Sequence, residues 1–402
     1  MSTKDVVIID GVRTAFGRMG GTIRDFSCSQ LGGIALKGLI DKTGIREKAH
    51  VDSVFAGSAT HCSQALNPAR FISLAAGLPY ETSASYVEMQ CGSAIDAINH
   101  AAWKIKANQA DIIIAGGMES YSQMAVKFSM ATPPYKLHPP MPILSTLSPV
   151  PEDAIGMGQT AENLQVQYDI PREAADEFAF NSQMRAKAAM EAGYLEEEIV
   201  PVTIAGTRKT PEVKFDTDEH PRSTTTLEGL AKLRPAFKID GTVTAGNSSG
   251  QNDGAGFVLI MSAEKAKELG YTPMARWVSG ADYGCDPKIM GIGPAYAVPM
   301  ALKRAELTVS QVDVFECNEA FAVQNLAVIK EIENQTGETI NRDKWNPMGG
   351  AIAFGHPNGA SGARICIFAM KHLIRSGGRY GVFSSCCGGG LGVATVIENL
   401  QI

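Results

Sequence analysis

The 402-residue chain contains one α/β unit twice, and any fold proposed for it must accommodate both copies. An apolar segment at 51–57 reads VDSVFAG, and about 261 residues later a related segment at 312–318 reads VDVFECN. Further along each copy, a helix and an apolar strand lead to a glycine-rich turn, at 116–117 and at 388–390. The duplication could be purely structural. Even so, the corresponding loop–helix junctions hold the unusual residues in both halves, which makes these junctions the candidate site.

Short apolar strands alternate with amphipathic helices along the chain, which is typical of α/β proteins. After Cys91, apolar side chains recur at spacings of three, four and three residues, which predicts one buried face of a helix. A chain of this length exceeds one ordinary core and predicts roughly two or three domains. The helix residues are Ile95, Ile98, Ala102 and Ile105, and the expected strands are 6–9, 112–115, 257–261, 312–315 and 380–383.

The segment between the two halves, 118–240, has a different character. Residues 131–151 include seven prolines and cannot form one regular element. Residues 162–194 are rich in Ala, Glu, Gln and Arg and predict two helices, with Pro171 at the start of one. Residues 208–222 are polar and predict a surface loop. We interpret the whole segment as an insertion over the active face of the first half, serving as a lid or substrate-binding domain.

Composition excludes several classes of function. The net charge is −6 and is spread without blocks, which argues against nucleic acid or an anionic membrane as a partner. The sequence has no apolar run of about 18 residues and no signal-peptide pattern, so we expect a cytoplasmic protein that does not contact membranes. Eight scattered cysteines without a CxxC pair argue against a metal site and a disulfide scaffold.

Cys91 is expected at the start of the helix described above. That position brings the sulfur near unpaired N–H groups and the positive end of the helix dipole, which favours a reactive thiolate. The alternative is a small buried thiol, the more common fate of a lone cysteine.

His356 and Cys386 lie in glycine-rich surroundings in the second half. His356 stands between glycine-rich turns at 349–362, just before a helix, where an imidazole can act as a base or serve only a turn. Cys386 lies at the end of a strand before Gly388, whose N–H group could form an oxyanion hole. The alternative interpretation, an ordinary buried strand end, is equally supported. Because Cys386 and Cys387 are adjacent on a strand, we expect only one to face the site.

Other polar residues have two possible roles. Asn318 and Glu319 follow an apolar strand, where they can cap a helix or orient a catalytic water, and position alone favours the cap. Four basic residues near the polar loop could bind phosphate or form ordinary surface charge: Arg222, His220, Lys232 and Arg234.

Four segments together resemble the thiolase family, and the resemblance covers nearly the whole chain. They are CGSA at 91–94, NEAF at 318–321, GHPNGASG at 355–362 and CCGGG at 386–390. Supporting segments lie at 10–14, 116–120, 157–162 and 247–253. The resemblance implies a five-layered αβαβα sandwich of two duplicated, five-stranded mixed-sheet halves with an inserted loop domain. The implied divisions are 1–117 with 241–268, then 118–240, then 269–402.

The resemblance also implies a role for each residue of the site. Cys91 would be acylated after activation by His356, in ping-pong fashion. Cys386 would take the α-proton of a second acyl-CoA or return it to the leaving enolate. Asn318 would hold a water that, with His356, binds the thioester oxygen, while the N–H groups of Cys91 and Gly388 stabilise the oxyanion. This chemistry needs no metal and no redox cofactor. The implied coenzyme A contacts are Arg222, Phe237, Ala245, Ser249, Ala320 and Phe321.

Several positions bear on the substrate. Ala94 replaces the usual glycine, Asn358 the usual aliphatic residue, and Gly156 a histidine that in short-chain biosynthetic members helps to bind the pantetheine end. Met157 and Met290, however, match residues that shorten the acyl pocket, and 247–250 looks biosynthetic.

We therefore expect a transferase of lipid metabolism that converts acetyl-CoA to acetoacetyl-CoA. A longer or bulkier 3-oxoacyl-CoA is the open alternative. Two further readings are a decarboxylating ketoacyl synthase or hydroxymethylglutaryl synthase relative, and a degenerate, non-catalytic coenzyme A-binding subunit. The partners implied are acyl-CoA, CoA and further copies of the chain in a homodimer or homotetramer.

Overall fold

The computed structural model describes residues 5–61, 65–129, 140–143, 145–208 and 210–402. In the first half the strands pair in the order β4-β3-β5-β9-β1, and in the second half in the order β11-β12-β13-β10. The strands are β1 (Val6–Thr14), β3 (Ser53–Gly57), β4 (Ser83–Val87), β5 (Ile112–Ser120), β9 (Asn252–Ser262), β10 (Ala275–Gly284), β11 (Val314–Cys317), β12 (Tyr380–Cys387) and β13 (Leu391–Asn399).

The two halves repeat the same strand directions as well as the same order. β3 is parallel to β5, and β9 is antiparallel to β5 and β1. Correspondingly, β11 is parallel to β12, and β13 is antiparallel to β12 and β10. The internal duplication predicted from the sequence is therefore present in the fold.

The second half lacks a full counterpart of edge strand β4. Where a fifth strand was expected, the described residues contain only an isolated parallel bridge between Phe315 and Trp345. The following residue, Asn346, has a positive φ of 46°, which ends extended backbone. Its side chain takes over the pairing: the backbone N–H of Cys317 donates to Asn346 Oδ1 (2.8 Å), and Asn346 Nδ2 donates to the Cys317 carbonyl (2.9 Å).

The two sheets also join edge to edge. β1 pairs with β10 over three residues, from Val6 opposite Trp277 to Ile8 opposite Ala275. With the short strands β2 (Gly17–Arg18) and β6 (Ile199–Val200), the result is one continuous eleven-stranded sheet that folds over on itself.

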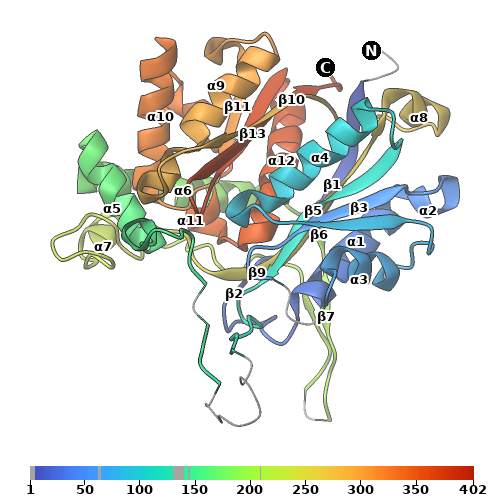
Figure 1. Ribbon diagram of the computed structural model, residues 1–402, viewed down its shortest axis with the longest axis horizontal. Helices are drawn as coiled ribbons and strands as arrows, with labels where there is room; N and C mark the ends of the chain where they lie inside the picture. The colour runs from blue at the N-terminus through green and yellow to red at the C-terminus, as the bar shows by residue number, and fades with distance from the viewer. Residues whose placement is uncertain (1–4, 62–64, 130–139, 144, 209) are drawn as a thin grey trace.

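Helices cover the sheet in three layers, so the protein is a five-layered αβαβα sandwich (Figure 1). The strands are apolar on both faces because both are covered: Val6 and Ile8 point into the central core, and Val7 points into the outer core of the first half. The central helices are α4 (Ser93–Lys106) and α12 (Asn358–Ser376); α1 (Cys28–Thr43) and α3 (Pro68–Ala75) cover the first half, and α9 (Pro294–Arg304) and α10 (Ala322–Thr336) the second. Short helices are α2 (Ile45–Lys48), α8 (Ala263–Glu268) and α11 (Ala351–Phe354).

The segment between the halves contains the two predicted helices, α5 (Met157–Tyr168) and α6 (Arg172–Glu191), followed by the short helix α7 (Leu227–Ala231). The prediction of a plain polar loop at 208–222 is partly wrong. Val213–Phe215 forms β8, which pairs with β7 (Val202–Ile204). Asp218 is buried because it accepts two hydrogen bonds from the guanidinium of Arg13, at 2.7 and 2.8 Å.

Residues 131–139 and 144 of the proline-rich segment 131–151 lie outside the described residues. In the described remainder, Pro142 forms an isolated bridge with Phe128. No helix in the described part of the chain is long and apolar enough to cross a membrane.

Candidate active site

Cys91 lies in a tight turn directly before α4, as the sequence predicted. The turn spans Gln90–Gly92, and Gln90 adopts a positive φ of 48°. Ser93 fixes the turn by accepting from the backbone N–H of Met89 (2.9 Å) and donating to the carbonyl of Gln90 (2.6 Å). A side chain at Gly92 would be 2.5 Å from the sulfur of Cys387, so only glycine fits there. The chain is thus held to present one sulfur atom at the positive end of a helix.

Three N–H groups act on the sulfur of Cys91. The backbone N–H groups of Gly388 and of Cys91 itself favour the thiolate and lower the pKa of the thiol, and Asn358 Nδ2 donates to Sγ at 3.3 Å. The expectation that the helix start alone favours a thiolate is nevertheless wrong for the resting protein. Cys91 is only 8% exposed, and burial raises the pKa of its thiol to about 12 despite these donors. The resting cysteine is therefore a thiol that must lose its proton before it can react.

His356 and Asn318 form a second, buried pair. Asn318 Nδ2 lies 3.2 Å from His356 Nε2, and His356 Nδ1 lies 2.6 Å from the hydroxyl oxygen of Ser361. Because the Ser361 hydroxyl donates to the carbonyl of Pro357 (3.2 Å), its oxygen accepts a hydrogen bond from Nδ1–H of His356. This network selects the tautomer with hydrogen on Nδ1 and leaves Nε2 as the acceptor. Burial, followed by the charge of Arg364, lowers the pKa of His356 to about 3, so the imidazole is neutral at pH 7.

The side-chain oxygen of Asn318 can accept a further hydrogen bond. Asn318 Oδ1 is buried and has no hydrogen-bond partner among the described residues. Buried acceptors of this kind are usually satisfied by an ordered water or by a ligand. The position therefore fits the expected bound water beside His356.

The prediction that Asn318 or Glu319 caps a helix is wrong. α10 starts at Ala322, and its N-cap residue, Phe321, makes no side-chain capping bond. Glu319 instead accepts hydrogen bonds from the Ser182 hydroxyl (2.6 Å) and the Ile352 backbone N–H (3.2 Å). It thereby ties the short helix α11, just before His356, to helix α6 of the inserted segment.

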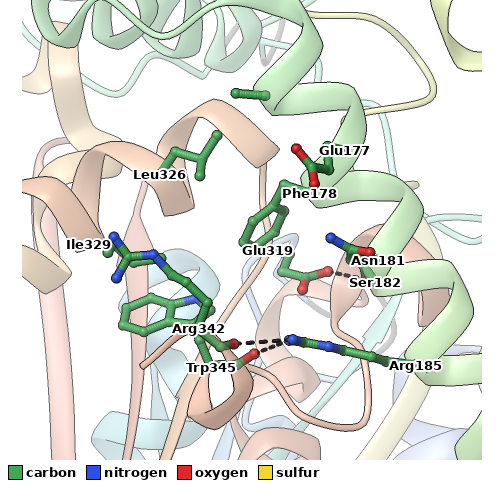
Figure 2. A pocket seen from close by; sticks show the side chains of 11 residues that line it. Glu177, Phe178, Asn181, Ser182, Arg185, Glu319, Leu326, Ile329, Arg342 and Trp345 are labelled. Atoms are coloured by element: carbon green, nitrogen blue, oxygen red, sulfur yellow. Dashed lines mark hydrogen bonds between the residues drawn. The ribbon is translucent and has the colours of Figure 1, made fainter. Parts of the chain in front are cut away.

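Glu319 also forms the floor of a hollow of about 260 Å³ between α6 and α10 (Figure 2). The two arginines on its wall are already engaged: Arg185 bonds to the backbone of the loop at Arg342, and Arg342 pairs with Glu333 at 2.7 Å. This hollow thus lies behind the loop that contains Asn318. The side chains that line it join elements that position the site.

Cys386 and Cys387 point to opposite faces of β12, as their adjacency predicted. Cys386 packs in the core of the second half with Met290, whereas Cys387 packs in the central layer. Both thiols interact electrostatically with Cys91, and burial raises both pKa values well above the usual range.

Leu147, from the proline-rich segment, is a contact that sequence reasoning missed. Its side chain lies 2.9 Å from where a Cβ on Gly388 would stand, so it packs directly against this glycine. The available signal was weak: a leucine between Thr146 and Ser148, in a segment with no periodicity.

Four predicted coenzyme A contacts lie together. Arg222, Phe237, Ala245 and Ser249 line a hollow of about 570 Å³. Two more predicted contacts border it: the Ser249 backbone N–H donates to the carbonyl of Ala320 (2.9 Å), and the rings of Phe237 and Phe321 meet edge to face at 6.1 Å. Lys232 and Arg234 do not line it.

The hollow ends next to His356. Gly250 is part of its lining, and its carbonyl accepts from the His356 backbone N–H at 3.1 Å. His220, also in the lining, is neutral because burial and the neighbouring Arg222 lower its pKa to about 4. Met157 packs against the same core as Met290 and Cys386.

A duplicated α/β sandwich that holds a cysteine in a helix-start turn with N–H groups at its sulfur, together with a neutral, buried imidazole, fits an enzyme that transfers acyl groups. Residues 6–264 match the N-terminal domain of thiolase, and residues 271–399 match the C-terminal domain of thiolase. The chain belongs to the thiolase family and is a thiolase-type acyltransferase.

Relatives of similar identity differ in their named activities. The chain is 42% identical to an acetyl-CoA acetyltransferase of Syntrophomonas wolfei, over 99% of this chain and all of that one. It is 43% identical, over the same shares, to a β-ketoadipyl-CoA thiolase of Acinetobacter baylyi. Human mitochondrial 3-ketoacyl-CoA thiolase has the same fold, with a TM-score of 0.90 and 40% identity over 99% of this chain and all of that one. A structure of that human enzyme in complex with CoA aligns with a TM-score of 0.89, at 40% identity over 99% of this chain and 98% of that one.

Proposed function

We propose that this enzyme interconverts two molecules of acetyl-CoA with acetoacetyl-CoA and CoA, through an acyl group carried on Cys91. The observation that carries the proposal is the set of N–H groups at the sulfur of Cys91, one of them from Asn358, which lies two residues after the neutral, buried His356. Met290, which is fully buried, and Leu147 beside Gly388 support a short acyl group.

In the first half-reaction, His356 accepts the thiol proton and the sulfur of Cys91 attacks the thioester carbonyl. A carbon–sulfur bond forms to Cys91, and the bond to CoA breaks as the departing CoA sulfur takes the proton of the Cys386 thiol. This step leaves Cys386 as a thiolate and His356 protonated. The backbone N–H groups of Cys91 and Gly388 stabilise the oxyanion of the intermediate. Aligned N–H dipoles suit this task because a buried negative charge is poorly solvated.

In the second half-reaction, the Cys386 thiolate removes the α-proton of another acetyl-CoA. The resulting enolate oxygen accepts hydrogen bonds from the protonated Nε2 of His356 and from a water that donates its other hydrogen to the buried Oδ1 of Asn318. The enolate carbon attacks the acyl group, the new carbon–carbon bond forms, and the electron pair of the broken thioester returns to Cys91, which takes back the proton from His356. Burial favours the neutral thiol of Cys386, the form in which it begins and ends the cycle.

We propose further that the inserted segment 118–240 provides the coenzyme A-binding part of the protein. It supplies Arg222 and Phe237 to the hollow of about 570 Å³, where the guanidinium is suited to a phosphate. Ser249 and Ala245, from the first half, line the same hollow. The division of the chain into three parts and its assembly as a homodimer or homotetramer remain predictions.

A longer or bulkier 3-oxoacyl-CoA is a second candidate substrate. A Cβ added at Gly156 would meet nothing within 4 Å, so the site has open space where related short-chain enzymes have a histidine. The named activity of the β-ketoadipyl-CoA thiolase relative is consistent with this alternative.

A thiolysis panel of 3-oxoacyl-CoA substrates, from four carbons upward and including branched and aromatic acyl groups, tests the choice. We expect the highest kcat/KM with acetoacetyl-CoA. A kcat/KM that rises with acyl size would overturn the short-chain proposal in favour of the second candidate. Tight binding of acyl-CoA without turnover of any substrate would instead support a non-catalytic subunit.

A further inference from the structure

Asn358, from the second half, touches the proposed nucleophile of the first half. Its Nδ2 lies 3.3 Å from the sulfur of Cys91, which is hydrogen-bonding distance for a sulfur acceptor. At this position thiolases usually have an aliphatic side chain, which can donate nothing. The contact therefore adds to the cysteine of this chain a donor that the family pattern does not supply.

The backbone on either side of Asn358 is fixed, so the amide is aimed by the fold. Two residues before Asn358, the backbone N–H of His356 donates to Asn252 Oδ1 at 3.0 Å. The following residue, Gly359, donates its N–H to the buried carboxylate of Glu119 at 2.9 Å. A Cβ at Gly359 would be 2.4 Å from the backbone of Ser58, which shows how closely this turn is packed. Asn358 is the first residue of α12 and is not its N-cap, so its side chain is available for the sulfur.

The surroundings of Cys91 oppose its ionisation. The titratable groups that interact with its sulfur are all acids: Glu88, Glu119, Tyr121, Cys386 and Cys387. Each carries either no charge or a negative one, and His356 is neutral. A thiolate at Cys91 is therefore stabilised by neutral N–H dipoles, and each additional donor matters.

We propose that Asn358 is a catalytic residue that donates a hydrogen bond to the Cys91 thiolate, next to the backbone donors of Gly388 and Cys91. The inference rests on the proposed function, in which Cys91 is the nucleophile. In acylation the sulfur electron pair forms the bond to the acyl carbon, and in acyl transfer from the enzyme that bond breaks and the pair returns to the sulfur. The amide of Asn358 donates to the sulfur when Cys91 is a thiolate, which is before acylation and after the acyl group leaves. It transfers no proton itself.

The test is the pH dependence of Cys91 alkylation by iodoacetamide, followed by mass spectrometry of the Cys91 peptide. The variants are Asn358→Leu, which removes the donor at similar volume, and Asn358→Asp, which replaces the amide with an isosteric carboxylate. The control is Asn163→Leu, which removes an amide on α5 that donates to the carbonyl of Lys288. A role in packing alone would not move this pH profile.

We expect Asn358→Leu to raise the midpoint of the alkylation profile by about one pH unit, since a hydrogen bond to a charged group is worth about that much. Asn358→Asp should raise it further because it adds a negative charge beside the sulfur, and Asn163→Leu should match the wild type. Midpoints in both Asn358 variants equal to that of the wild type would overturn the proposal, as would wild-type Cys91 that is not alkylated at any pH. The isosteric Asn358→Asp variant keeps the test decisive if Asn358→Leu does not fold.

Alkylation requires no acyl-CoA, so the two proposals fail separately. If acetyl-CoA leaves no acyl group on Cys91 but the midpoint shifts, the proposed function fails and the role of Asn358 as a thiolate donor stands. If the acyl group forms and the midpoint is unchanged, only the role of Asn358 fails.

Discussion

Asn318 Nδ2 lies 3.2 Å from His356 Nε2, and both side chains are buried. The two residues come from different junctions of the second half, one after β11 and one before α12. Their contact leaves Oδ1 of Asn318 free for a water, while the contact of His356 with Ser361 fixes the tautomer. The pair thus provides a neutral base and an ordered acceptor at one point.

Replacing Asn318 by alanine should lower kcat for thiolysis about 100-fold, because an enolate oxygen would lose its bound water. We expect KM for acyl-CoA to change little, since the hollow that includes Arg222 is untouched. Steady-state kinetics with acetoacetyl-CoA would measure both values, with Asn163→Ala as the control. A kcat equal to that of the wild type would contradict the assigned role.

The depressed pKa of His356 predicts a loss of stability in acid. The unfolded histidine titrates near 6.5 and the folded one near 3, so the unfolded state binds the extra proton as pH falls through this interval. The contribution of His356 is fully present above pH 6.5 and decreases by about 2 kcal/mol by pH 5. Urea unfolding of wild type and His356→Asn at several pH values should show a smaller pH slope for the variant.

The exposed His100 on α4 offers a matched control for that experiment, since its side chain is 48% exposed. We expect His100→Asn to retain the wild-type slope. Equal slopes for wild type and His356→Asn would show that the folded protein does not hold His356 in its neutral form.

Gly156→His should shift preference toward short acyl groups. The position has room for a side chain, and an imidazole there would fill space at the pantetheine end. We expect the ratio of kcat/KM for acetoacetyl-CoA over a longer substrate to rise about tenfold, a typical effect of reshaping a pocket. Gly33→His, on α1 in the outer layer of the first half, is the control because its nearest neighbour would be 3.5 Å away. The same shift in both variants would rule out a local effect.

Leu147→Ala should relax the limit on acyl size. Leu147 covers Gly388, so truncation opens space beside the sulfur of Cys91. In the thiolysis panel we expect longer substrates to gain about tenfold in kcat/KM relative to acetoacetyl-CoA. Leu66→Ala, at a fully exposed leucine, should leave the ratio unchanged. No gain for any longer substrate in Leu147→Ala would mean that this leucine does not limit the pocket.

The sequence was sufficient to predict the features that depend on local pattern. The duplicated unit, the helix after Cys91, the two helices of the insertion and the opposite faces of Cys386 and Cys387 follow from spacing alone. The catalytic roles came from resemblance, because only the fold brings Asn318 to His356. Asn318 and His356 are 38 positions apart in the sequence, and no periodic pattern indicates that they lie close together in space.

Other features depended on tertiary contacts that no local pattern reveals. Leu147 reaches Gly388 from a proline-rich segment, and Asn358 reaches Cys91 across 267 positions of sequence. Among the described residues the second half has no fifth strand, because the side chain of Asn346 pairs with Cys317 in its place. The reactivity of Cys91 was misjudged because a helix start favours the thiolate, whereas burial, which the sequence does not show, opposes it more strongly.

The most direct test of the proposed function is to incubate the protein with acetyl-CoA, digest it and locate any acetyl group by mass spectrometry. We predict one acetyl group on Cys91, its loss in Cys91→Ser and its retention in Cys366→Ser, which alters a buried thiol in the central layer. An acetyl group on another cysteine, or none on Cys91 in the wild type, would contradict the assignment of Cys91 as the residue that carries the acyl group.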